Sequence, residues 1–345
     1  MQPLDFGLRA EDILATAHVV DLPLNTRFRG LDRREALVFE GPRGWSEFSP
    51  FVEYLPAEAS TWLAAAIDFA YAPEPTLLRT EVAVNATVPA VPAAEVPRVL
   101  ARFPGCTTAK VKVAERGGTL AQDVERVAAV RAALGPGGLI RVDANGGWSV
   151  TEAEIALEAL APYGLEYAEQ PCATVPELAE LRTRIAGLGA RIAADESVRK
   201  AEDPLAVARA GAADLLVIKA QPLGGIARAR DIVAAAGLPV VVSSALDTSV
   251  GLSMGARLAA SLPDLSFACG LGTAALLAAD VTDAPLVPEN GVIHAERIDV
   301  NPDLLTRFVA APERRDWWFD RVRACLHVLA EPGSSASNMT NRVTS

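Results

Sequence analysis

The sequence has few histidines: His18, His294 and His327 are the only three in 345 residues. None of them lies at the end of a predicted barrel strand, so a Ser/His/Asp or Cys/His mechanism has no visible general base. The four cysteines are far apart and form no C-x-x-C pair. This spacing predicts free thiols in a reducing, cytoplasmic location rather than a disulfide framework.

The sequence also lacks long apolar runs and an excess of basic residues. No stretch of about 20 apolar residues is present, so we expect no membrane span. The first residues, MQPLDFGLRAED, carry acids where a signal peptide needs basic residues. Lys and Arg number 32 against 43 Asp and Glu, a net charge of −11 that disfavours nucleic acid as a partner. With membrane and nucleic acid disfavoured, we expect a small molecule as the binding partner. The sequence leaves the oligomeric state open.

Short β-branched runs alternate with alanine-rich amphipathic segments over most of the chain. The predicted strands cover residues 81–90, 107–113, 139–145, 165–171, 191–197, 215–222, 239–247 and 266–272. Strands that alternate with helices through short connections predict βαβ units and a parallel sheet.

The residues near the ends of these strands recur at a nearly fixed spacing. They are Asp143, Glu169, Asp195, Lys219, Ser243 and Cys269, separated by 26, 26, 24, 24 and 26 residues. A period near 25 is typical of successive β/α units in a closed barrel, where strand ends face the active-site mouth. The sequence therefore predicts an α/β fold, a modified TIM barrel of the (β/α)7β kind.

The two ends of the chain differ in texture from the barrel. Residues 34–50 predict a β-hairpin and residues 57–71 an amphipathic helix. We predict an α+β capping domain over residues 1–90, a barrel over 91–309, a helical segment over 310–330 that returns to the cap, and a disordered tail over 331–345.

Three acids end three consecutive strands: Asp143, Glu169 and Asp195. Adjacent strands lie about 4.8 Å apart, and three converging carboxylates need a compensating cation. A hard divalent ion with oxygen ligands, Mg²⁺ above all, fits this pattern. Any one of these acids could instead cap a helix or pair with an arginine. Glu196 is expected to point away from the pocket or to support the ligands from outside.

The segment AKVKVAE places Lys110 and Lys112 on one face of a strand. If residues 81–90 form the first strand, these lysines lie on the second and Lys219 on the sixth, opposite each other across the barrel. Paired ammonium groups lower a lysine pKa from about 10.4, which favours a basic amine. The layout suits proton abstraction beside a carboxylate. Alone, the segment would favour solvated lysines on an exposed strand.

Together these motifs resemble the muconate-lactonizing subgroup of the enolase superfamily. They are K-x-K at 110–112, D-x-N at 143–145, E-Q-P at 169–171, D-E-S at 195–197 and the lone Lys219. Segments such as GWSEFSPFVEY, EQPCATVPELAELR and VVVSSALDTSVGL are similar to a family of actinobacterial dehydratases in menaquinone biosynthesis. The resemblance covers nearly the whole chain.

The resemblance implies Mg²⁺ on the three acids, with Mn²⁺ as a substitute. It implies a syn-dehydration of 2-succinyl-6-hydroxy-2,4-cyclohexadiene-1-carboxylate. Lys112 would take the proton next to the carboxylate and return it to the departing hydroxide. Lys219 would stabilise the enediolate from the opposite face, and Lys110 would contact the substrate carboxylate.

The resemblance also implies a substrate pocket. Its predicted residues are Ser243, Ser244, Gly270, Gly272, Arg29 and Asn145, the serines and glycines lining the succinyl group. The segment NTRFRG resembles the mobile capping loop of the family, where Arg27 and Arg29 could meet substrate carboxylates. An exposed basic loop without a ligand is equally compatible, and Asn145 could be an ordinary turn residue before Gly146.

Two other functions stay open at this point. An N-succinylamino acid racemase or a cycloisomerase could use the same scaffold, because two opposed lysines also suit 1,1-proton transfer. A barrel that only binds ligands would predict interrupted ligand or lysine positions, and none is interrupted.

Overall fold

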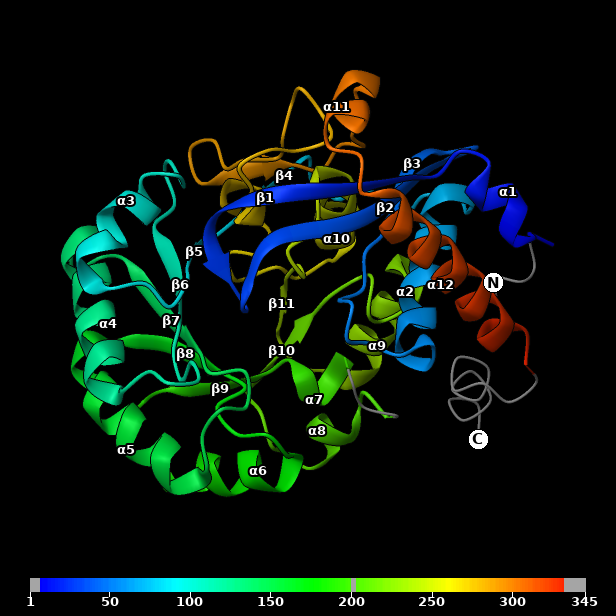
Figure 1. The fold of residues 1–345 in the computed structure, drawn as a ribbon. Helices are drawn as coiled ribbons and strands as arrows, with labels where there is room; N and C mark the ends of the chain where they lie inside the picture. Colours follow the sequence, from blue (N-terminus) through cyan, green and yellow to red (C-terminus); the bar gives the residue numbers. More distant parts are fainter. Residues whose placement is uncertain (1–6, 200–202, 332–345) are drawn as a thin grey trace.

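The computed structural model describes residues 7–199 and 203–331 of the chain. The predicted disordered tail lies outside the described residues, except for Glu331. Figure 1 shows a curled sheet surrounded by helices, with a smaller antiparallel sheet lying across one side of it.

The curled sheet consists of seven parallel strands in chain order, from β5 to β11. They are β5 (Ala86–Val88), β6 (Thr108–Lys112), β7 (Leu139–Asp143), β8 (Leu165–Glu169), β9 (Arg191–Ala194), β10 (Leu215–Ile218) and β11 (Val240–Val242). Nearly every residue of these strands is buried, because helices cover the outside of the sheet and the inside faces other strands.

An eighth segment closes the sheet into a barrel. Gly270 forms a parallel bridge with Ser243, which directly follows β11, and Cys269 bridges to Val84 on the other side. The backbone N–H of Asn85 donates to the carbonyl of Cys269 at 2.9 Å. The modified TIM barrel is thereby confirmed, although its eighth strand is reduced to these bridges.

The helices of the barrel follow their strands as the alternation predicted. They are α3 (Val96–Leu100), α4 (Leu120–Leu134), α5 (Val150–Leu160), α6 (Val175–Arg184), α7 (Glu196–Arg199), α8 (Ala206–Arg209), α9 (Ile226–Ala236) and α10 (Ser249–Ser261), with short 3-10 turns η2 (Ala93–Glu95), η3 (Ala161–Tyr163) and η4 (Gly272–Leu276). Thr119, Ser149 and Thr174 begin α4, α5 and α6 with capping boxes. Each box satisfies otherwise unpaired backbone donors at the helix start.

The smaller sheet and its helices form the N-terminal cap. Its elements are α1 (Ala10–Leu14), β1 (His18–Phe28), β2 (Leu31–Gly41), β3 (Gly44–Phe48) and α2 (Pro56–Tyr71), joined by α12 (Pro312–Ala330). Trp62 of α2 and Trp318 of α12 lie in one buried cluster with Phe48. This packing explains why α12 returns to the N-terminal part of the chain. The remaining elements are β4 (Glu81–Ala83), which pairs with β12 (Val292–His294), and α11 (Pro302–Arg307).

The predicted hairpin at 34–50 and helix at 57–71 are confirmed as β2–β3 and α2. The segment NTRFRG was expected to be a loop, and this is wrong for most of it. Strand β1 continues to Phe28, and only Arg29 and Gly30 form the turn to β2. Both have positive φ, which suits a tight hairpin turn. The exact domain boundaries at 90 and 309 stay predictions.

Candidate active site

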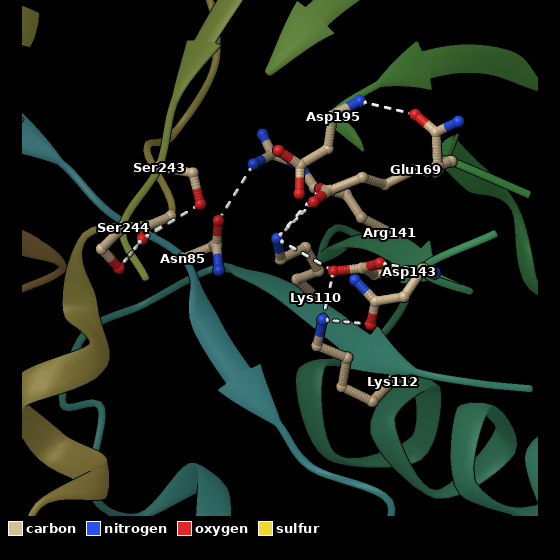
Figure 2. Close-up of polar contacts among 12 residues, drawn as sticks. Asn85, Lys110, Lys112, Arg141, Asp143, Glu169, Asp195, Ser243 and Ser244 are labelled. Carbon is tan, nitrogen blue, oxygen red and sulfur yellow. Dashed lines mark hydrogen bonds and ion pairs between the residues drawn. The ribbon is translucent and has the colours of Figure 1, made fainter. Parts of the chain in front are cut away.

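The three predicted acids lie side by side at the carboxyl ends of β7, β8 and β9. Asp143 and Glu169 are partners in the parallel register of β7 and β8, and Asp195 directly follows β9. Each is only 1% exposed. Figure 2 shows all three carboxylates on the inner side of these strands. Parallel strand order and register therefore bring together residues 26 positions apart in sequence.

Lys110 lies between two of these carboxylates. Its Nζ donates to both carboxylate oxygens of Glu169 at 2.9 Å and lies 3.3 Å from Oδ2 of Asp143. Burial opposes the charged lysine, but the charges of Glu169 and Asp143 outweigh it and raise the pKa of Lys110. Lys110 is therefore a fixed cation, and the lowering expected from its lysine neighbour is outweighed here.

Lys112 occupies the end of the same strand, β6. Its Nζ donates to Oδ2 of Asp143 at 2.5 Å and to Oδ1 of Asn145 at 2.8 Å. The Phe28 ring from the tip of the cap hairpin lies 5.5 Å from this ammonium. Asn145 has a positive φ and so combines the two roles considered for it, a turn residue and a contact in the site. Its amide also donates to Glu196 at 3.3 Å.

Lys219 approaches the site from β10, beyond the acids. Its Nζ donates to Oδ2 of Asp195 at 2.6 Å, and Arg199 donates to the other carboxylate oxygen at 3.1 Å. Burial lowers the pKa of Lys219, although Asp195 raises it. Burial likewise opposes the charge on Asp195, but Lys219 and Arg199 lower its pKa to about 2. Asp195 is thus firmly ionised.

Glu169 differs from the other two acids in the direction of its pKa shift. Burial, followed by the charge of Asp143, raises the pKa of Glu169 to about 7. Burial also disfavours ionised Asp143, yet Lys112 and Lys110 lower its pKa below the usual range. A cation beside Glu169 would therefore favour the ionised form of the one acid in the cluster whose pKa is raised.

The three side chains fit a hard divalent ion, because they offer buried carboxylate oxygens that lie close together and repel one another when ionised. Within the described residues, no three His, Cys, Asp or Glu groups are arranged as a ready-made metal site. Lys110 occupies the space between Glu169 and Asp143 and Lys112 also pairs with Asp143. Binding an ion would therefore require these carboxylates to exchange ammonium partners for the metal.

One cavity unites most of the predicted residues. It is lined by Phe28, Arg29, Phe51, Thr87, Lys110, Lys112, Asp143, Asn145, Lys219, Ser243, Ser244, Ala245, Leu246, Gly270 and Thr273. Lys112 and Lys219 thus reach the same space from β6 and β10. Of the predicted pocket residues, Gly272 is not among those that line this cavity, and a Cβ there would meet Asn85, Pro288 and Phe103. Its contact with a substrate stays a prediction.

Sequence reasoning missed several cavity residues. Thr87 is the register partner of Lys110 on β5, so a polar residue inside an otherwise apolar strand was the available signal. Thr273 exchanges a 2.8 Å hydrogen bond with Ser244. Phe28 and Phe51 come from the cap, and no local pattern links them to the barrel.

Arg29 lies at the cap tip above the cavity, with its guanidinium 4.5 Å from the centre of the Phe51 ring. Arg34 approaches the same ring at 4.6 Å. Arg34 is buried and donates to the carbonyls of Ser49 in the cap and Leu246 in the barrel. The cap therefore both covers the cavity and fixes the loop that follows β11.

Two family models match the chain in the same order as these two parts. Residues 19–70 match an "Enolase N-terminal domain-like" model and residues 93–299 match an "Enolase C-terminal domain-like" model. The second match covers more than half of the chain. The fold, the strand-end acids and these matches define the class of protein: the chain belongs to the enolase superfamily, whose enzymes generally use Mg²⁺.

Curated relatives narrow the family further. The chain is 56% identical over 319 residues to an o-succinylbenzoate synthase of Mycobacterium marinum, covering 92% of this chain and 95% of the relative. It is 56% identical over 320 residues to the o-succinylbenzoate synthase of Mycolicibacterium smegmatis, covering 92% and 97%. Within the superfamily, the chain is a member of the o-succinylbenzoate synthase family and an enzyme of the lyase class.

Solved structures agree on the fold. A muconate lactonizing enzyme from Pseudomonas fluorescens, in complex with muconolactone, matches with a TM-score of 0.73 at 19% identity, over 86% of this chain and 98% of that one. The L-Ala-D/L-Glu epimerase from Bacillus subtilis matches with a TM-score of 0.69 at 22% identity, over 82% and 96%. In the described part of this chain, no helix is long and apolar enough to span a bilayer.

Proposed function

We propose that the protein is an o-succinylbenzoate synthase of menaquinone biosynthesis. It would convert 2-succinyl-6-hydroxy-2,4-cyclohexadiene-1-carboxylate to o-succinylbenzoate and water. The 56% identity to curated synthases over nearly the whole chain supports the substrate. The observation that carries the chemistry is the single cavity lined by Lys112, Lys219 and the buried acid Asp143.

We assign the metal site to Asp143, Glu169 and Asp195, with Mg²⁺ as the ion and Mn²⁺ as a substitute. When bound, the ion would supply positive charge for the substrate carboxylate and for the enediolate formed from it. Lys110, held between Glu169 and Asp143, would supply a second fixed positive charge beside that carboxylate.

Lys112 would carry both proton transfers. As an amine, it takes the proton from C1, and the C1–H electron pair moves into the enediolate. That pair then forms the C1–C6 double bond and expels the hydroxyl at C6, which leaves as water with the proton held by Lys112. The elimination is syn because Lys112 removes the proton and protonates the leaving hydroxyl on the same face of the ring. The ring becomes aromatic, so the second step is strongly downhill.

Lys219 would stabilise the enediolate from the opposite face. It is held by Asp195 at 2.6 Å and is 8% exposed, so its charge acts in a water-poor site where it is most effective. Ser243, Ser244 and Gly270 line the far wall and would meet the succinyl group. Arg29 would meet a substrate carboxylate at the cavity mouth.

A second activity is favoured by one observation. Because Lys112 and Lys219 reach the same cavity from β6 and β10, a substrate carbon between them could lose a proton to one and gain it from the other. N-succinylamino acid racemisation is such a reaction.

All four cysteines of the chain are free, which supports our further proposal of a cytoplasmic location.

The experiment compares two reactions, dehydration of the cyclohexadiene substrate and racemisation of an N-succinylamino acid, each with and without EDTA. We expect EDTA-sensitive dehydration with a higher kcat/KM than racemisation. Racemisation without dehydration would favour the second activity. Dehydration that is unaffected by complete metal removal would contradict the assigned metal site.

A further inference from the structure

Gln170 follows Glu169 and lies fully buried between β8 and β9. Its Oε1 accepts hydrogen bonds from the backbone N–H groups of Asp195 at 3.0 Å and Ser197 at 3.1 Å. Its Nε2 donates to the carbonyl of Cys172 at 2.9 Å and to Oγ of Ser197 at 2.7 Å. The amide thus links the segment after Glu169 to the segment that carries Asp195.

The backbone of Gln170 extends this link to a third strand. Its N–H donates to the carbonyl of Ala193 in β9 at 2.7 Å, and its carbonyl accepts from the N–H of Gly146 at 2.6 Å. Gly146 lies in the turn that follows Asp143 and β7. A single residue therefore connects the ends of all three strands that carry the proposed metal ligands.

This arrangement is maintained against a local cost. Gln170 has φ +38°, a conformation that non-glycine residues rarely adopt and that costs on the order of 1–3 kcal/mol. Such a conformation persists only where surrounding contacts fix it. Here the contacts are the amide hydrogen bonds, and replacing the amide by an apolar group would leave the buried N–H groups of Asp195 and Ser197 without their acceptor.

We propose that Gln170 is a positioning residue for the metal site: its amide fixes the distance between the carboxylates of Glu169 and Asp195 so that one divalent ion can engage both. This inference rests on the proposed metal-dependent function. Residues that orient metal ligands from outside typically change metal affinity by about 10- to 100-fold when they are replaced. Gln170 itself does not touch the substrate cavity.

The test measures Mg²⁺ binding to the full chain by titration calorimetry, independently of turnover. We expect Gln170→Met, which keeps the side-chain volume but removes the amide, to weaken Mg²⁺ binding by about 10- to 100-fold. Gln221→Met is the matched control. Gln221 follows β10 and is 3% exposed, and neither atom of its amide has a hydrogen-bond partner among the described residues. We expect it to keep the wild-type affinity.

Ser197→Ala provides a milder test if Gln170→Met fails to fold, because it removes one acceptor of the Gln170 amide and keeps the rest. We expect a weaker Mg²⁺ affinity in the same direction. A lowered melting temperature in Gln170→Met with wild-type Mg²⁺ affinity would mean a merely structural role and would overturn the inference, as would unchanged affinity in Ser197→Ala. If the wild-type chain binds no Mg²⁺, the proposed metal site fails as well.

Discussion

Glu47 of the cap strand β3 caps the first turn of α10 in the barrel through Thr248. The backbone N–H of Thr248 donates to Oε2 of Glu47 at 3.1 Å, and its hydroxyl donates to the same oxygen at 2.5 Å. The N–H of Gly251 adds a third bond at 3.0 Å. The first N–H groups of a helix lack partners within the helix and favour negative charge. The carboxylate of Glu47, from the N-terminal domain, therefore accepts hydrogen bonds from the first backbone N–H groups of the barrel helix α10.

The first prediction concerns pH. Burial, followed by the charge of Asp247, raises the pKa of Glu47 from 4.5 to about 7, despite the nearby Arg34. Between these values the folded chain holds a proton that the unfolded chain has released, so this group's contribution to stability falls as pH rises from about 4.5 to 7. We expect Glu47→Gln to reduce this fall in melting temperature, measured in EDTA from pH 5 to 8.

The comparison with the wild type isolates Glu47, because Glu169 also has a raised pKa and contributes equally to both curves. Asp247 faces Glu47 and its pKa is raised in the same direction, so part of the pH dependence should remain in the variant. Identical slopes in the two proteins would contradict the assignment to Glu47.

The second prediction concerns Gly251 in the first turn of α10. Alanine favours helices over glycine by about 1 kcal/mol, yet a Cβ here would lie 2.8 Å from Glu47, Asp247 and Gln221. Glu47 is held by several hydrogen bonds and cannot move aside easily. We expect Gly251→Ala to lower the free energy of unfolding by about 1–3 kcal/mol, as overpacking does, measured by urea denaturation.

Gly255→Ala, one turn later in α10, is the matched control. Its Cβ would approach only the end of the Leu271 side chain, at 2.7 Å, and a leucine methyl can rotate away. We expect a smaller loss than for Gly251→Ala. Equal losses of unfolding free energy in the two variants would contradict the argument that Glu47 cannot move aside.

The third prediction concerns the proposed base. Lys112→Ala should reduce kcat by about 10⁴-fold or more, since general acid–base catalysis contributes about 10²–10⁴-fold and this group acts twice. Lys112→Arg keeps a cation beside Asp143 but cannot act as a base, so we expect it to be equally inactive. Neither variant should bind Mg²⁺ more weakly than the wild type, because Lys112 pairs with the proposed ligand Asp143 and is not itself a ligand. An active arginine variant would show that Lys112 supplies only charge.

The fourth prediction concerns metal removal. A ligand at 100 times its Kd stabilises the folded state by about 2.7 kcal/mol, so saturating Mg²⁺ should raise the melting temperature by several degrees over EDTA. We expect Glu169→Gln to lose most of this increase. Asp264→Asn, at an exposed position, should keep it. A full increase in the Glu169 variant would exclude that carboxylate as a ligand.

The barrel and the positions of its acids and lysines could be predicted because they follow from short, regularly spaced sequence motifs. A spacing of 24–26 residues sets Asp143, Glu169, Asp195 and Lys219 on successive strand ends, and parallel order then makes them neighbours. The K-x-K segment likewise needs only the period of a strand to place both lysines on one face, as the shared cavity shows.

What the sequence could not predict depends on contacts between distant parts. Phe28 and Phe51 line the cavity from the cap, and no periodicity links them to β6 or β11. Gly272 begins the 3-10 turn η4 and lies beside Asn85, Pro288 and Phe103, whereas the next residue, Thr273, lines the cavity. Sequence spacing alone cannot tell which of two adjacent turn residues faces the cavity. The ion pairs of Lys110 with Glu169 and Asp143 could not be predicted either, because strand positions do not fix where a long side chain ends.

The contacts of Arg34 and Glu47 have a consequence for how such enzymes can diverge. Both side chains are buried cap residues whose partners, Leu246 and Thr248, belong to the barrel. A chimera that took its cap from one homologue and its barrel from another would have to keep the barrel backbone at Leu246 and Thr248 within reach of these two side chains. Otherwise each buried side chain would keep only its contacts within the cap, such as those with Ser49. New substrate preferences in this lineage should therefore arise through coordinated changes on both sides of that seam.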